Sequence, residues 1–72
     1  IEANLLTAPA ADVIVLANWS GAPMTTTIML DQAPRYAEIK AVNAEIVSQT
    51  QVDDVLTVTL RLDAGAFLEC RR

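Results

Sequence analysis

The sequence predicts an all-β domain, a small antiparallel β-sandwich of about five to six strands. The main observation is the segment 55–62, V-L-T-V-T-L-R-L, where apolar residues alternate with threonine and arginine. Alternation with a period of two residues is typical of a strand with one buried and one solvated face. The second observation is that turn residues recur at intervals of roughly 8–12 residues, as they do in sandwiches.

Size and composition limit what such a domain can hold. The chain has 72 residues, of which 53% are hydrophobic and only 4% are aromatic. A domain of this size buries about 60% of its unfolded surface, and its core must be built from valine, isoleucine, leucine and alanine. That is enough for two thin layers, whereas a ligand pocket of ~300 Å³ or more would consume much of the fold. We therefore do not expect the chain to be an enzyme by itself.

The first eleven residues are expected to lead into the domain. Residues 1–11 contain Pro9 and several alanines, and Leu5 and Leu6 can pack on the domain. The β-sandwich domain itself is expected to span residues 12–72. Because the chain starts with isoleucine rather than methionine, we expect this domain to be part of a larger protein.

Two strands are expected in the first half of the domain. Residues 12–18 are apolar through their middle, which is typical of a central strand covered on both sides. Residues 19–23 predict a turn, because Gly21 accepts a positive φ and Pro23 cannot donate to a ladder. Residues 25–30 are first β-branched and then apolar, and they predict the second strand.

The segment 36–48 fits either a helix or two strands. Tyr36, Ile39 and Ile46 lie at helical spacing, and good helix formers surround them. With a period of two, alanine and isoleucine in its first half face inward while glutamate and lysine face outward. The period alone does not decide between them; two strands joined by a turn at Asn43 suit an antiparallel sheet better, and the family resemblance described below favours them.

The last third of the chain predicts an antiparallel hairpin. Asp53-Asp54 can form a turn before the strand 55–62. Asp63-Ala64-Gly65 can turn the chain again, and residues 66–70 then alternate a second time. The two alternating segments are therefore expected to pair as neighbouring strands.

Charge and apolar runs indicate which partners to expect. The net charge is −4, and the five basic residues are scattered apart from the pair Arg71 and Arg72. Because no basic stripe could follow a phosphate backbone, nucleic acid is not an expected partner. The longest apolar run, 13–17, is far shorter than the ~20 residues of a membrane span, so no membrane partner is expected. The single cysteine, Cys70, leaves the compartment open.

The sequence predicts no catalytic residue, no cofactor site and no metal site. The absence of histidine removes nucleophiles activated by histidine and imidazole metal sites. Cys70 lies on the apolar side of its predicted strand, and we interpret it as a buried, inert thiol. Glycosidic chemistry needs two carboxyl groups that face each other about 5–10 Å apart. Asp53 and Asp54 are adjacent in sequence, and we interpret them as a solvated turn.

Trp19 and Asn18 are the candidates for a contact with a sugar or with a neighbouring domain. An indole at a turn can stack on a sugar face. A single tryptophan is more often a cover over the end of a core or an anchor against another domain, and we favour that role. Asn18-Trp19-Ser20 also matches the N-glycosylation sequon, which matters only in a secreted eukaryotic protein.

The order of these landmarks resembles the small β domain that closes many multidomain bacterial glycoside hydrolases and their uncharacterised relatives. Such domains often open with an apolar strand that ends in asparagine, followed by an aromatic or polar residue, serine or threonine, and glycine or aspartate, as residues 13–21 do. They often close with an alternating strand, a short turn and an apolar last strand, as residues 56–70 do. The resemblance covers residues 12–70. It implies a C-terminal sandwich that packs on the catalytic domain and carries no catalytic residues.

Together these observations give two hypotheses. The first is a non-catalytic accessory domain, with a structural or docking role, whose partner is the catalytic domain of a larger carbohydrate-active enzyme. The alternative is a carbohydrate-binding module that uses Trp19 and neighbouring polar residues.

Overall fold

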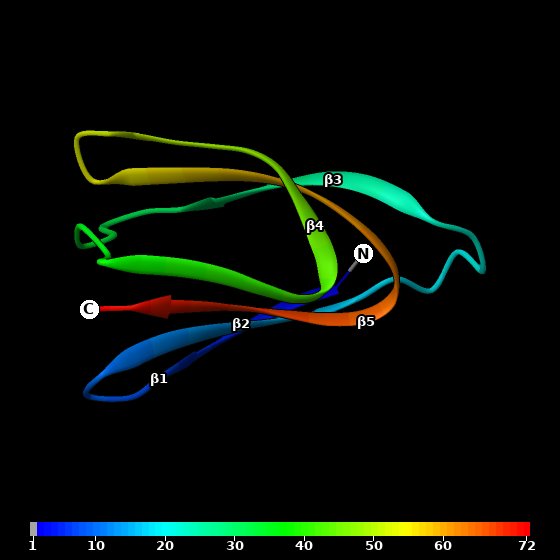
Figure 1. Ribbon diagram of the computed structural model, residues 1–72, viewed down its shortest axis with the longest axis horizontal. Coiled ribbons are helices and arrows are strands. Elements are labelled where there is room, and N and C mark those ends of the chain that lie inside the picture. Colours follow the sequence, from blue (N-terminus) through cyan, green and yellow to red (C-terminus); the bar gives the residue numbers. More distant parts are fainter. Residues whose placement is uncertain (1) are drawn as a thin grey trace.

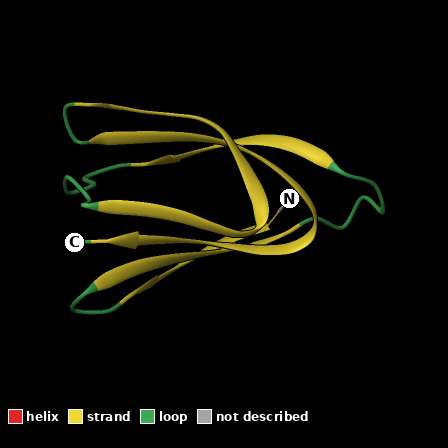
Figure 2. Ribbon diagram, viewed as in Figure 1, coloured by secondary structure: helices red, strands yellow, loops and turns green. Residues whose placement is uncertain are grey.

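The computed structural model describes residues 2–72 and consists of one antiparallel sheet of five strands (Figure 1, Figure 2). These are β1 (Glu2–Thr7), β2 (Ala11–Ala17), β3 (Met24–Leu30), β4 (Glu38–Val52) and β5 (Val55–Arg71). The prediction of an all-β domain is confirmed. Within residues 2–72 there is no helix that is long and apolar enough to cross a membrane.

β5 is the central strand of the sheet. β4 pairs with β5 along one edge over most of its length. On the other edge, β3 pairs with β5 from Leu56 to Leu62, and β2 pairs with it from Gly65 to Arg71. β1 pairs only with β2. The strand order is therefore β1-β2-β5-β4 in one half of the sheet and β3-β5-β4 in the other.

The sheet curls over where β4 and β5 bend, so that its two halves face each other in a half-barrel (Figure 1). Four residues of β5, 63–66, separate the partners of Val42 and Ala44, whereas only Asn43 separates these two residues on β4. β5 therefore follows the longer path around the bend. Asn43 has a φ of 60°, a left-handed conformation that asparagine adopts more readily than most residues.

Two of the predicted turns are wrong, because the strands continue through them. β5 passes through Asp63-Ala64-Gly65 as one bent strand, so residues 55–62 and 66–70 do not pair with each other. Asn43 is a bulge within β4 and not a turn between two strands. In both places pairing with neighbouring strands overrides the local preference of the chain for a turn.

The other sequence-based assignments agree more closely with the structure. Segment 38–48 is strand and not helix, and Asp53-Asp54 is the turn between β4 and β5. The predicted strands 12–18 and 25–30 correspond to β2 and β3, but β2 is not covered on both sides, because Val15 on its outer face is 40% exposed. Of the lead-in segment 1–11, residues 2–7 form β1, and its first residue lies outside the described residues. The halves that face each other belong to one continuous sheet.

The hydrophobic core lies between the two halves. β5 alternates without interruption, so its even-numbered residues from Leu56 to Cys70 face inward, and all of them except Ala64 at the bend are buried. β2 contributes Ile14 and Leu16 to the same core. Burial with a period of two, which the sequence predicted for this region, is therefore confirmed.

Residues 31–37 close the open end of the curl by crossing from β3 in one half to β4 in the other (Figure 1). The backbone N–H of Ala33 donates to the carbonyl oxygen of Asp54 at 2.7 Å. The N–H of Ala37 donates to the carbonyl oxygen of Arg71 at 2.8 Å. Because Asp54 and Arg71 lie in opposite halves, this loop fastens the two halves to each other.

Candidate functional site

Asn18 fastens the β2–β3 loop to the bend of β5. Only 8% of the residue is exposed. Its Nδ2 donates to the carbonyl oxygens of Ala22, Leu62 and Asp63 at 2.8, 3.3 and 2.9 Å. Its Oδ1 accepts from the backbone N–H and the hydroxyl of Ser20 at 3.0 and 2.7 Å. Both ends of the amide are thus bonded within the protein.

These bonds define what Asn18 contributes to the candidate site. Its side chain holds the loop in place and positions the next residue, and its polar atoms already have partners. A glycan on Nδ2 would have to break the bonds to Leu62 and Asp63, so the sequon at 18–20 is not compatible with this conformation of the loop.

Trp19 is directed away from the core. It is 79% exposed, the highest value among the exposed large hydrophobic residues described. Its Nε1–H donates to the carboxylate of Glu2 at 3.4 Å, which is a long contact. The loop therefore places the indole beside the start of β1, with most of its surface free for a partner.

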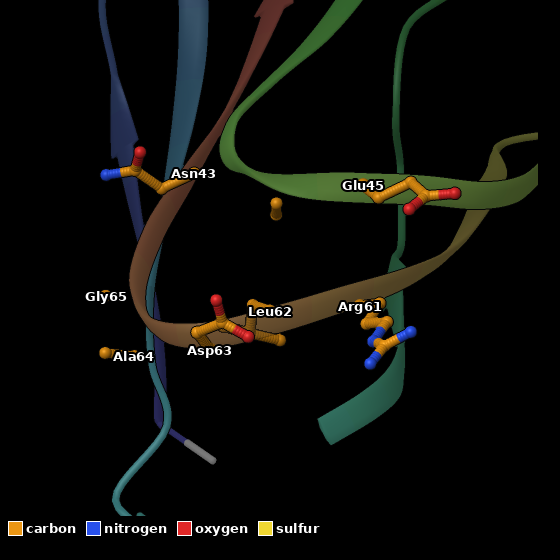
Figure 3. A pocket seen from close by; sticks show the side chains of 8 residues that line it. Asn43, Glu45, Arg61, Leu62, Asp63, Ala64 and Gly65 are labelled. Carbon is orange, nitrogen blue, oxygen red and sulfur yellow. The ribbon is translucent and has the colours of Figure 1, made fainter. Parts of the chain in front are cut away.

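A hollow of about 570 Å³ lies at the bend, where β5 separates from β4 (Figure 3). Asn43 and Glu45 of β4 and Arg61 and Asp63 of β5 line it. Glu45 and Asp63 extend from opposite strands and their carboxyl groups do not converge on one point (Figure 3). The hollow therefore lacks the pair of facing carboxyl groups that glycoside hydrolysis uses.

Metal ligands do not gather in the described part of the chain. No group of three or more His, Cys, Asp or Glu side chains among residues 2–72 could hold a metal ion. Asp53 and Asp54 occupy the turn between β4 and β5, where Asp53 has a φ of 55°.

A buried polar network around Asp12 escaped the sequence analysis. Asp12 is only 4% exposed. Its Oδ2 accepts from the hydroxyl of Tyr36 at 2.6 Å, and its Oδ1 accepts from Nη2 of Arg72 at 2.6 Å. Burial, followed by the hydrogen bond to Asp12 and its negative charge, raises the pKa of Tyr36 above its ordinary value. A buried aspartate requires such partners. The position of Asp12 in an apolar strand was therefore the feature of the sequence from which this network could have been predicted.

The outer face of the half formed by β1, β2, β5 and β4 carries an apolar patch. Phe67 is 40% exposed and lies between its strand partners Val15 and Val42. In the next row of the same face, Leu6 is 59% exposed and lies opposite Val13. We call these five residues the outer apolar patch.

The outer face of the other half is polar at its centre, whereas Met29 and Val52 nearer its end are 69% and 70% exposed. One row across its three strands consists of Thr27, Thr59 and Ser48. The hydroxyls of the two threonines lie 3.0 Å apart. These hydroxyls can bond water and suit a solvated surface, while Met29 and Val52 add exposed apolar area to the same half.

Comparisons with known proteins give no relative: no family model, no curated protein and no solved structure matches the chain. The function is therefore inferred from the geometry described above.

The replacement Asn18→Ala is expected to lower the free energy of unfolding by about 1–3 kcal/mol, because the partly buried carbonyl groups of Leu62 and Asp63 lose their donor. Urea unfolding would measure the change. Asn4→Ala on the exposed strand β1 is the matched control, with an expected change within about 0.5 kcal/mol. Equal losses in the two variants would contradict this role of Asn18.

Stability is expected to fall as the pH rises from about 9 to 11. Burial, with smaller effects of the negative charges of Asp12 and Glu69, raises the pKa of Cys70 from 9.0 to about 11. The unfolded chain therefore releases this proton at a lower pH than the folded chain. The contribution of the protonated thiol to the free energy of unfolding is complete below about pH 9 and is lost by about pH 11. The free energy of unfolding is expected to decrease by about 2–3 kcal/mol over this range.

Urea unfolding at a series of pH values would test this dependence. Cys70→Ala removes the thiol, so its stability should decline less steeply between pH 9 and 11 than that of the original protein. Parallel declines in both proteins would show that Cys70 is not responsible.

Proposed function

We propose that this chain is a non-catalytic accessory domain that docks on a larger protein through the outer apolar patch. The observation that carries the proposal is the row Val15, Phe67 and Val42, which lies across three paired strands with a phenylalanine at its centre. Contiguous exposed apolar side chains mark interaction surfaces, and aromatic side chains are common anchors in them.

The proposed partner is the catalytic domain of a carbohydrate-active enzyme that carries this domain at its C-terminal end. The resemblance of residues 12–70 to the terminal domains of glycoside hydrolases supports this choice. The all-β fold agrees with that resemblance. In this proposal the two facing halves of the sheet serve as the layers of a small sandwich, with the core between them and the docking patch outside.

Two observations support a mechanical rather than a chemical role. The chain has no histidine, and the carboxyl groups around the hollow at the bend do not converge. The function of the domain would be to bury the outer apolar patch against the catalytic domain and so to stabilise and orient it.

Phe67→Ser is expected to weaken docking at least about tenfold, because it removes the aromatic anchor of the patch. The measurement is a calorimetric titration of this chain with the catalytic domain of the same enzyme, produced separately. Met29→Ser is the matched control, since Met29 is 69% exposed on the outer face of the other half. Unchanged affinity of the Phe67 variant would refute docking through this patch.

Carbohydrate binding by Trp19 is a second candidate function, favoured by the 79% exposure of the only indole in the chain. Titration with oligosaccharides should then change the tryptophan fluorescence in a saturable way, because Trp19 is the only source of this fluorescence. Trp19→Ala should abolish binding in calorimetry, while Phe67→Ser should leave it intact. A flat response to a broad set of glycans would reject this function.

A further inference from the structure

The free edges of the sheet are protected unequally. Within residues 2–72 these edges belong to β1, β3 and β4. β4 carries Glu38, Lys40 and Glu45 and contains two register shifts. Charges and bulges of this kind prevent another strand from adding to an edge.

β1 has none of these protections after its first residue. Residues 3–7 are uncharged, contain no proline, and pair with β2 in a continuous register without a bulge. Leu5 and Leu6 are 49% and 59% exposed, and every residue of β1 is exposed. A regular edge strand with exposed leucines is a template for pairing with another strand.

β3 is uncharged as well, but its inner side is already partly covered by the rest of the protein. Thr26, Ile28 and Leu30 on its inner side are already partly buried. No residue of β1 is buried to that extent. β3 also exposes Met24 and Met29, at 38% and 69%, but only β1 exposes adjacent leucines on both of its faces, so a strand added beside β1 would cover aliphatic side chains on either side.

The inner side of β1 offers room for a partner. Leu5 lines a hollow of about 190 Å³ together with Ala3, Asn4, Ile14, Ile28, Met29 and Leu30. Six of these seven lining residues are apolar, so the hollow suits an aliphatic side chain. A strand added beside β1 would place one of its side chains at the rim of this hollow.

We propose that a second copy of this chain occupies the free edge of β1, by antiparallel pairing of β1 with β1 about a two-fold axis at Leu5. Opposed residues of antiparallel strands lie on the same face of the sheet. A two-fold axis therefore pairs odd positions with odd ones and even positions with even ones. Among the symmetric registers of β1, those centred on Asn4 or Leu5 give the longest overlap within the strand.

The register centred on Leu5 is the better of the two. It places Leu5 against Leu5 of the second copy and Asn4 against the other Leu6. It leaves Glu2 outside the pairing, where Glu2 keeps its contact with Trp19. The register centred on Asn4 would instead place the Glu2 carboxylate against a leucine. Glu2 is the only charged residue of β1, so the net charge of −4 comes mostly from residues outside this strand. Salt screens the repulsion between charges that lie far from the paired strands.

The pairing would join two sheets into one. Because both copies use the same edge, the assembly would stop at a dimer. The two outer apolar patches would then lie on the same face of the joined sheet. This inference does not depend on docking to an enzyme, since it involves only the edge of β1.

Sedimentation velocity of the whole chain over a wide range of concentrations tests the proposal. A dimer that dissociates on dilution is the expected result. Leu5→Lys should raise its dissociation constant at least about tenfold, because two like charges would meet at the axis. Val47→Lys is the matched control on the edge of β4, where Val47 is 56% exposed, and it should have no effect.

Other outcomes would overturn the proposal. A chain that is monomeric at every concentration would do so, and so would a dimer that Leu5→Lys leaves intact. Dissociation by Met29→Lys alone would assign the interface to β3 instead. Phe67→Ser should leave the dimer unchanged, which separates this test from the test of docking. Circular dichroism would verify that each variant keeps its β structure.

A disulfide provides a second measurement of the register. Opposed residues at the axis have Cα atoms about 4.5–5.5 Å apart, a separation that a disulfide can span. Oxidised Leu5→Cys should therefore form a covalent dimer, whereas oxidised Val47→Cys should remain monomeric. The native Cys70 has no exposed surface and does not compete. A folded Leu5→Cys variant that stays monomeric after oxidation would overturn the pairing.

Discussion

β5 carries both halves of the sheet because its alternation continues through the bend. The same set of even-numbered positions faces the core on both sides of residues 63–65. If one residue were inserted there, the second half of β5 would turn its apolar side chains to solvent. The strand absorbs the curvature by taking a longer path than β4, and Asn18 bonds the carbonyl groups of Leu62 and Asp63 at this bend.

The bend also explains which parts of the fold were predictable from the sequence. Regular strands such as 55–62 show their period directly, but Asp63-Ala64-Gly65 has the composition of a tight turn. Its extended course depends on pairing with β2 and on bonds from Asn18, which is 45 residues away from Asp63 in sequence. The helical spacing of Ile39 and Ile46 has a similar origin. The bulge at Asn43 shifts the alternation by one residue, so two inward-facing residues stand seven positions apart.

Local sequence could identify the candidate site residues but could not assign their roles. Asn18 and Trp19 are neighbours at a predicted turn, yet one is nearly buried and the other is 79% exposed. The difference arises because the Asn18 amide finds carbonyl partners on β5, a strand that only the tertiary fold brings near. Asp12 illustrates the same limit, since its partners Tyr36 and Arg72 come from distant parts of the chain.

The two proposed contact surfaces lie on the same half of the sheet. The outer apolar patch and the free edge of β1 both belong to the half β1-β2-β5-β4, whereas the outer face of the other half combines threonine and serine with exposed Met29 and Val52. Burial of the core does not require this difference, because both halves contribute inward-facing residues to one core. An apolar outer face costs solubility unless something covers it. The two proposals, docking through the outer apolar patch and pairing through β1, would each cover part of this half.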